Sequence, residues 1–213
     1  MRIASPVAVV SIVLLVAPLA ARADISDPAF TQTNFVSVPE LNNATGMAWV
    51  PDGSNRLFVI RKDGLVYVIK NGALVANPFV AITPIYTESE CGLIGIAFDP
   101  DFLTNHYVYL FVTVSATEQQ IIRYTVAGDV GTEKTPLVTG LPTRGVNHDG
   151  GAIGFGPDGK LYWAIGDNGN QSGAGDDRAA LTAKVGRANL DGTPVEDNPY
   201  FDGSGPNNDY IWA

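Results

Sequence analysis

Short runs of apolar, β-branched and aromatic residues, separated by Gly, Pro, Asn and Asp, follow one another from Thr45 onward. No stretch keeps an apolar period of 3.6 residues long enough to predict a helix. Short runs bounded by turn residues are typical of β-strands. The expected strands are 46–50, 56–60, 65–69, 79–82, 93–98, 107–114, 121–126, 137–139, 152–155, 161–165 and 185–190. The chain is therefore predicted to be nearly all β.

The expected strands also repeat. A Pro-Asp turn follows an apolar strand at Pro51, Pro100 and Pro157, so successive turns are 49 and 57 residues apart. About four strands in each repeat of roughly 50 residues are typical of propeller blades. We therefore predict a β-propeller of about three blades, and interpret residues 209–213 as the start of a fourth. A ring needs roughly four to eight blades to close, so the chain is expected to be truncated; a β-sandwich with chance Pro-Asp turns is the alternative.

The N-terminal residues have the order of a secretory signal peptide. Arg2 supplies a positive charge, residues 7–17 are apolar, and Ala21-Arg22-Ala23 offers a cleavage point before Asp24. The apolar run is too short to span a bilayer, and an uncleaved membrane anchor is the alternative. The predicted organisation is a signal peptide (1–23), a polar lead-in (24–44) and a partial propeller (45–213), in a periplasmic or secreted protein.

Charge and cysteine content narrow the choice of partners and of stabilising bonds. The formal net charge of −9 becomes −11 without the two arginines of residues 1–23. This acidic balance argues against nucleic acid or anionic lipid as a partner. Cys91 is the only cysteine, so the chain has no internal disulfide and depends on buried apolar surface. We interpret Cys91 as a small buried hydrophobic residue.

Two residues of the third repeat suggest acid–base chemistry. His148 lies in Asn147-His148-Asp149-Gly150-Gly151 before one expected strand, and Asp167 follows the next strand. A hairpin connection brings these two strand ends to the same edge, and the paired glycines let the backbone approach a neighbour or ligand closely. A carboxylate that holds one imidazole nitrogen leaves the other free to accept a proton. Two interpretations stay open, a general base or a His–Asp pair that pins two loops together.

Several segments resemble one enzyme family. Residues 90–102 read ECGLIGIAFDPDF and are similar to a segment of the soluble quinoprotein sugar dehydrogenases, the glucose/sorbosone dehydrogenase family. The resemblance continues in the same order through residues 140–142, 148–151, 156–162, 165–167, 184–194 and 196–199. Each segment is a weak signal alone, and the ordered set is a specific one.

The resemblance implies a six-bladed propeller that binds pyrroloquinoline quinone (PQQ) and calcium and oxidises the anomeric hydroxyl of an aldose to the lactone. It implies that His148 is the base, while hydride passes to the quinone, and that Asp167 orients His148. Glu90 and Asn147 match sugar-contacting positions, where some members carry Gln and Asp instead. Electrons would pass to a soluble acceptor, because no Cys-x-x-Cys-His haem motif is present.

The sequence also departs from the family pattern. An Arg-Asn-Pro motif, which begins the set of cations that clamp the PQQ carboxylates, is absent, and the family's calcium ligands are expected beyond residue 213. The loop at 168–183, which contains Gln171, Asp176 and Asp177, does not align, and these three residues are interpreted as solvated. Residues 24–213 alone are therefore expected to show no turnover. The alternatives are a non-catalytic extracellular propeller that binds carbohydrate or protein, and a calcium-dependent lactonase.

Overall fold

The computed structural model describes residues 27–144, 147–169, 175–205 and 207–213, so the predicted signal peptide lies outside the described residues. Its strands form three antiparallel sheets, all within one compact unit, Phe35–Ala213. Helical structure in the described part is confined to single turns, which are η1 (Pro39–Leu41), α1 (Phe102–Asn105) and η2 (Asn208–Tyr210). No helix among these residues is long and apolar enough to cross a bilayer.

The first sheet has the order β1-β2-β3-β4. β4 pairs with the C-terminal end of β3, and β5 pairs with its N-terminal end. Its strands are β1 (Ala44–Trp49), β2 (Arg56–Arg61), β3 (Leu65–Lys70), β4 (Ala73–Leu74) and β5 (Val80–Ala81). The strand predicted at 79–82 is reduced to the two residues of β5, while Phe79 and Ile82 on either side of it are buried in the core.

The second sheet has the order β6-β7-β8-β9. Its strands are β6 (Leu93–Phe98), β7 (Tyr107–Ser115), β8 (Glu118–Ala127) and β9 (Val130–Pro142). The pairing of β8 with β9 contains several register shifts, so the outer strand follows its neighbour with repeated irregularities. Such bulges bend and twist a strand locally.

The third sheet has the order β10-β11-β12, with β10 (Ile153–Phe155), β11 (Leu161–Ile165) and β12 (Lys184–Ala188). Residues 209–213, interpreted from the sequence as the start of a fourth repeat, are placed differently by the structure. Ile211 forms a bridge with Gly186, and Trp212 donates its backbone N–H to the Val185 carbonyl. Through these backbone bonds the segment covers the free edge of β12, and Ile211 is fully buried in the cluster that contains Trp163.

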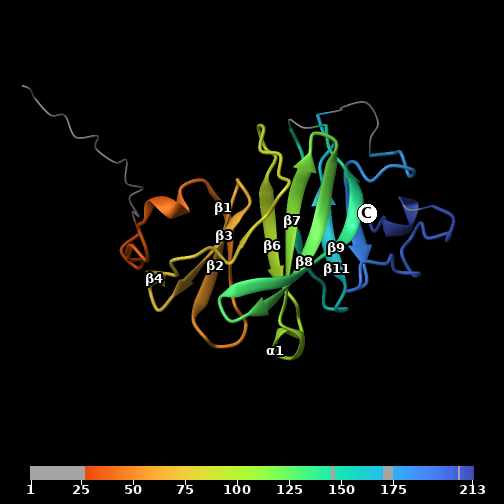
Figure 1. The fold of residues 1–213 in the computed structure, drawn as a ribbon. Coiled ribbons are helices and arrows are strands. Elements are labelled where there is room, and N and C mark those ends of the chain that lie inside the picture. Colours follow the sequence, from red (N-terminus) through yellow and green to blue (C-terminus); the bar gives the residue numbers. More distant parts are fainter. Residues whose placement is uncertain (1–26, 145–146, 170–174, 206) are drawn as a thin grey trace, which may run out of the picture. The chain divides into compact units, whose positions relative to one another are not determined.

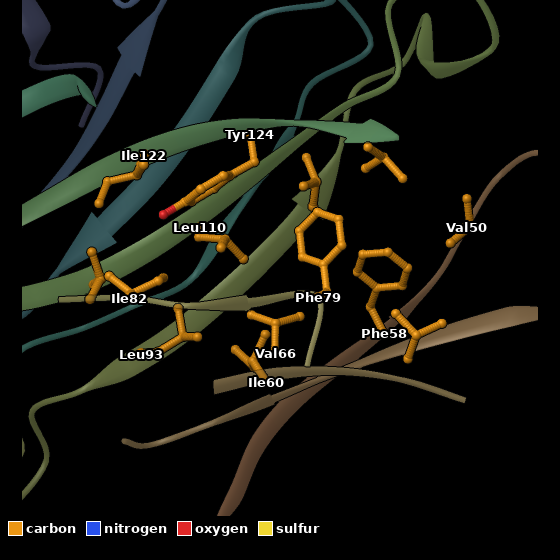
Figure 2. Packing of buried hydrophobic residues seen from close by; sticks show 14 of the residues in the cluster. Val50, Phe58, Ile60, Val66, Phe79, Ile82, Leu93, Leu110, Ile122 and Tyr124 are labelled. Atoms are coloured by element: carbon orange, nitrogen blue, oxygen red, sulfur yellow. The ribbon is translucent and has the colours of Figure 1, made fainter. Parts of the chain in front are cut away.

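The middle strand β7 carries apolar side chains on both faces, because successive residues of a strand point to opposite sides. Leu110 and its neighbours at 108 and 112 pack against the first sheet, while Tyr109 and Phe111 pack against the third. Figure 2 shows the first of these layers, in which the rings of Phe58 and Phe79 are 4.7 Å apart. The middle strand of the second sheet is therefore covered on both faces by the neighbouring sheets.

The first strands of the three sheets lie next to one another, since β6 contacts both β1 and β10. The three sheets therefore follow each other in chain order, each packed face to face on the next (Figure 1). This is the arrangement of consecutive propeller blades. The all-β, β-propeller fold class predicted from the sequence is confirmed.

Candidate active site

The predicted pair of His148 and Asp167 meets at one edge of the third sheet. His148 lies in the loop before β10, and Asp167 follows β11 after Gly166. Nδ1 of His148 and Oδ1 of Asp167 are 2.5 Å apart, and the backbone N–H of Gly169 donates to the same carboxylate oxygen at 2.9 Å. The hairpin geometry therefore brings the two side chains together, as the sequence predicts.

The arrangement of the pair suits an imidazole that accepts protons. The side chain of His148 is 52% exposed, and its second nitrogen, Nε2, is not used in the contact with Asp167. The hydrogen bond and the charge of Asp167 raise the pKa of His148 above its ordinary value of 6.5. The same hydrogen bond lowers the pKa of Asp167. Asp167 thus fixes the ring and stabilises its protonated form.

The loop that precedes β6 runs beside the loop that carries His148. The carboxylate of Glu90 accepts the backbone N–H of His148 at 2.5 Å. Oγ of Ser89 donates to Oδ1 of Asn147 at 2.9 Å. The structure therefore places both predicted sugar-contacting residues, Glu90 and Asn147, next to His148.

A third contact, absent from the sequence interpretation, continues this pattern. The thiol of Cys91 donates to Oδ2 of Asp149 at 2.9 Å, so three consecutive residues of one loop bond to three consecutive residues of the other. Cys91 is buried, as predicted, but it is a polar partner rather than only a small hydrophobic residue. Burial, and then the neighbouring Asp149 carboxylate, raises the pKa of the thiol to about 12.

Close backbone packing holds the His148 loop against β11. A Cβ at Gly150 would lie 2.2 Å from the Ala164 carbonyl oxygen, and one at Gly151 would lie 2.7 Å from the Ile94 side chain. Both glycines also have positive φ angles, of 85° and 111°. The predicted role of the glycine pair, close approach to a neighbouring backbone, is what the structure shows for Gly150.

The loop after Asp167 is described only in part, and Gln171 lies outside the described residues. Asp176 and Asp177 are exposed, in agreement with their interpretation as solvated. No group of three His, Cys, Asp or Glu side chains that could hold a metal ion occurs in the described ranges. Two cavities, of about 500 and 630 Å³, are lined by other residues and include neither His148 nor Asp167.

The described residues fit one side of a PQQ site. They supply an exposed imidazole with a fixed tautomer, and carboxylate and amide groups beside it. Within the described ranges a cation bonded to these loops is Lys62, whose ammonium group donates to the Ser89 carbonyl. A tricarboxylate cofactor would therefore depend on further cations for its clamp, and the donor set here fits the role of base and substrate contacts.

Comparison with known proteins identifies the class. The family model described as Glucose / Sorbosone dehydrogenase matches residues 41–213. The chain belongs to the glucose/sorbosone dehydrogenase family.

Individual relatives agree with this assignment. Quinoprotein glucose dehydrogenase B of Acinetobacter calcoaceticus is 30% identical over 200 residues, which cover 79% of this chain and 41% of that protein. The PQQ-bound aldose sugar dehydrogenase of Streptomyces coelicolor is 31% identical, with a TM-score of 0.68, and the match covers 76% of this chain and 49% of that one. The mouse Hedgehog-interacting protein is 31% identical over 137 residues, which are 54% of this chain and 19% of that protein. The chain thus spans about half or less of the length of these relatives.

Proposed function

We propose that the complete gene product oxidises an aldose at its anomeric hydroxyl to the lactone, with PQQ as the electron acceptor. The observation that carries this proposal is the exposed His148 ring held at 2.5 Å by Asp167, in a chain of the glucose/sorbosone dehydrogenase family. Two relatives, a quinoprotein glucose dehydrogenase and a PQQ-bound aldose sugar dehydrogenase, support the choice of cofactor and substrate class.

His148 acts as the general base in this reaction. Nδ1 is occupied by Asp167, so Nε2 takes the proton of the anomeric hydroxyl as the carbon–oxygen double bond forms. The hydrogen on the anomeric carbon leaves with its electron pair, and PQQ, when bound, supplies the two-electron acceptor. Asp167 stabilises the imidazolium that results, because its carboxylate is already paired with the ring.

Glu90 and Asn147 contact the sugar beside the base. Glu90 uses Oε2 for the His148 backbone, which leaves Oε1 to accept a hydrogen bond from a sugar hydroxyl. Asn147 uses Oδ1 to accept from Ser89, which leaves its amide N–H groups as donors. The two side chains therefore offer one acceptor and one donor to adjacent hydroxyls.

The remaining parts of the proposal rest on the family and on the N-terminal sequence. Calcium is required with PQQ, and its ligands lie outside the described residues. The protein is periplasmic or secreted after cleavage of residues 1–23, and it passes electrons to a soluble acceptor. Reading the coding sequence past Ala213 is the first check. An Arg-Asn-Pro motif followed by further basic residues supports the dehydrogenase, and a continuing propeller without them favours a binding module.

The decisive experiment is dye-linked sugar oxidation by the complete gene product reconstituted with PQQ and calcium. His148→Ala is expected to lower turnover by about 100-fold or more, which is the usual contribution of a general base. His106→Ala is the matched control, because His106 is exposed in the turn before β7. Undiminished turnover in His148→Ala, or no PQQ binding in calorimetry, would contradict the proposal.

A further inference from the structure

The residue after His148 is a buried carboxylate that the proposed chemistry does not use. The side chain of Asp149 points to the interior while that of His148 is exposed, and Asp149 is 0% exposed. Burial of a carboxylate is costly unless hydrogen bonds replace the lost water. The partners of Asp149 therefore indicate what the burial achieves.

All the hydrogen-bond partners found for Asp149 are donors. Oδ2 accepts from the Cys91 thiol at 2.9 Å, and Oδ1 accepts from Nε2 of Gln119 at 3.1 Å and from the hydroxyl of Thr143. Three donors, with no acceptor among the residues that the structure describes, suit a negatively charged carboxylate. The charge is balanced here by dipoles, since none of these three partners is a cation.

These donors belong to the second sheet or to the segments that flank it. Gln119 lies in β8, Cys91 precedes β6 and Thr143 directly follows β9, whereas Asp149 leads into β10 of the third sheet. Of the three contacts between the two loops, only the one made by Asp149 is buried on both sides. Asp149 is therefore the buried anchor of the loop that carries the base.

The backbone of His148 shows that this loop is held in place. Its φ angle is +58°, in the left-handed region that residues other than glycine adopt at a cost.

Three carboxylates act on the ring of His148, those of Asp167, Glu90 and Asp149, and each of them raises the pKa of His148. Asp149 differs from the other two because its charge is enclosed and therefore weakly screened by solvent.

We propose that Asp149 is a positioning residue for His148, which anchors the base loop to the second sheet and fixes a negative charge beside the imidazole. The proposal rests on the proposed function in that His148 is the base. Its effect on the ring can nevertheless be measured without turnover.

The test is an NMR titration of the His148 ring in the complete gene product, without cofactor, for the unaltered protein and for Asp149→Asn. The amide keeps the shape of the carboxylate and removes its charge, so the pKa of His148 is expected to fall. Asp99→Asn is the matched control. Asp99 is a 1% exposed carboxylate at the other end of β6, bonded to the Tyr109 hydroxyl at 2.8 Å. A lower pKa in Asp149→Asn alone supports the proposal; equal ring titrations in the two variants overturn it.

A second pair of variants keeps the proposal testable if Asp149→Asn does not fold. Cys91→Ala removes one donor from the carboxylate, and Cys91→Ser keeps a donor at that position. Hydrogen exchange of the His148 backbone N–H is expected to be faster in the alanine variant and near the unaltered rate in the serine variant. Equal exchange in both variants would contradict an anchoring role.

Turnover measurements separate this proposal from the proposed function. In an active protein, Asp149→Asn is expected to lower kcat by about 100-fold, the scale of a misplaced catalytic group, with little change in KM. If Asp99→Asn lowers kcat by a comparable factor with little change in KM, the effect of Asp149→Asn reflects general stability and not the position of His148. If the unaltered protein neither binds PQQ nor oxidises sugar, the proposed function fails, and the ring titration still decides whether Asp149 positions His148.

Discussion

A side chain at position 166 would collide with the backbone of His148. A Cβ added to Gly166 would lie 2.2 Å from the His148 carbonyl oxygen and 2.9 Å from the His148 Cβ. Gly166 directly precedes Asp167, so its lack of a side chain lets the end of β11 approach the loop that carries the base. The 2.5 Å contact between the imidazole and the carboxylate depends on this close approach.

Gly166→Ala is therefore expected to separate His148 from Asp167. The added methyl group forces a shift of the backbone next to both residues, and a displacement of about 1 Å costs up to about 100-fold in turnover. Gly154→Ala in β10 is the matched control, because a Cβ there meets nothing within 4 Å. Sugar oxidation by both variants is the measurement, and equal rates would contradict the expected steric effect.

The rate of sugar oxidation is expected to rise with pH through a midpoint above 6.5, because the base must be neutral and Asp167 raises the pKa of His148.

The stability that the pairing of His148 with Asp167 contributes changes with pH in the opposite direction near neutral pH. Between the pKa of Asp167 and the unfolded pKa of the histidine the pairing contributes fully to stability, and it is lost as pH rises through the higher folded pKa of His148. It is also lost at low pH, as pH falls through the lowered pKa of Asp167. A pH profile of kcat/KM with a midpoint below 6.5 would argue against this pairing.

Asp167→Asn is expected to lower turnover by about 100-fold or more and to move the midpoint of the pH profile downward. The amide removes the negative charge that stabilises the imidazolium, and it does not fix the same tautomer. Asp158→Asn serves as the control at the other end of the same hairpin, where Asp158 pairs with Arg187 at 2.8 Å. Steady-state kinetics across pH distinguish the two variants, and a similar loss in both would point to hairpin stability instead.

Glu90→Gln is expected to keep most of the turnover, since an amide oxygen still accepts the His148 N–H. Glu90→Ala removes this acceptor and the proposed sugar contact, so it is expected to raise KM and lower kcat together. The two variants are compared by kinetics with one aldose. Equal behaviour of glutamine and alanine would show that the contact to the His148 backbone, 2.5 Å long in the structure, is not needed.

Leu110→Ala is expected to lower the free energy of unfolding by about 2–5 kcal/mol, the usual cost of truncating a buried leucine. Leu110 is 0% exposed in β7 and packs in the layer between the first and second sheets. Leu103→Ala is the control, because Leu103 in α1 is 70% exposed and its truncation is expected to change stability by about 0.5 kcal/mol or less. Denaturant unfolding of both variants is the measurement.

The strands that the sequence predicts best are those with continuous apolar runs between turn residues. β6 and β11 begin and end at the predicted residues, because Gly or Pro-Asp turns flank strongly β-forming sequences. β9 extends from Val130, whereas only 137–139 were expected, since its first half is polar and is defined by pairing with β8. The single turn α1 is too short to show a helical period.

The contacts of the candidate site could likewise be predicted from the sequence only in part. The contact between His148 and Asp167 is predictable, because both residues flank one hairpin and local chain geometry determines where they lie. The pairing of Cys91 with Asp149 joins residues 58 apart on different sheets, and it depends on how two blades pack. The sequence offered one signal, an acid between a histidine and two glycines, and its burial becomes evident only in three dimensions.

The buried thiol of Cys91 also provides a built-in spectroscopic reporter. The chain has one cysteine, so its S–H stretching vibration, which falls where other protein groups absorb little, comes from a single site. The frequency of that vibration depends on the strength of the hydrogen bond to Asp149. Vibrational spectra of this chain, without any label, can therefore follow the interior side of the base loop.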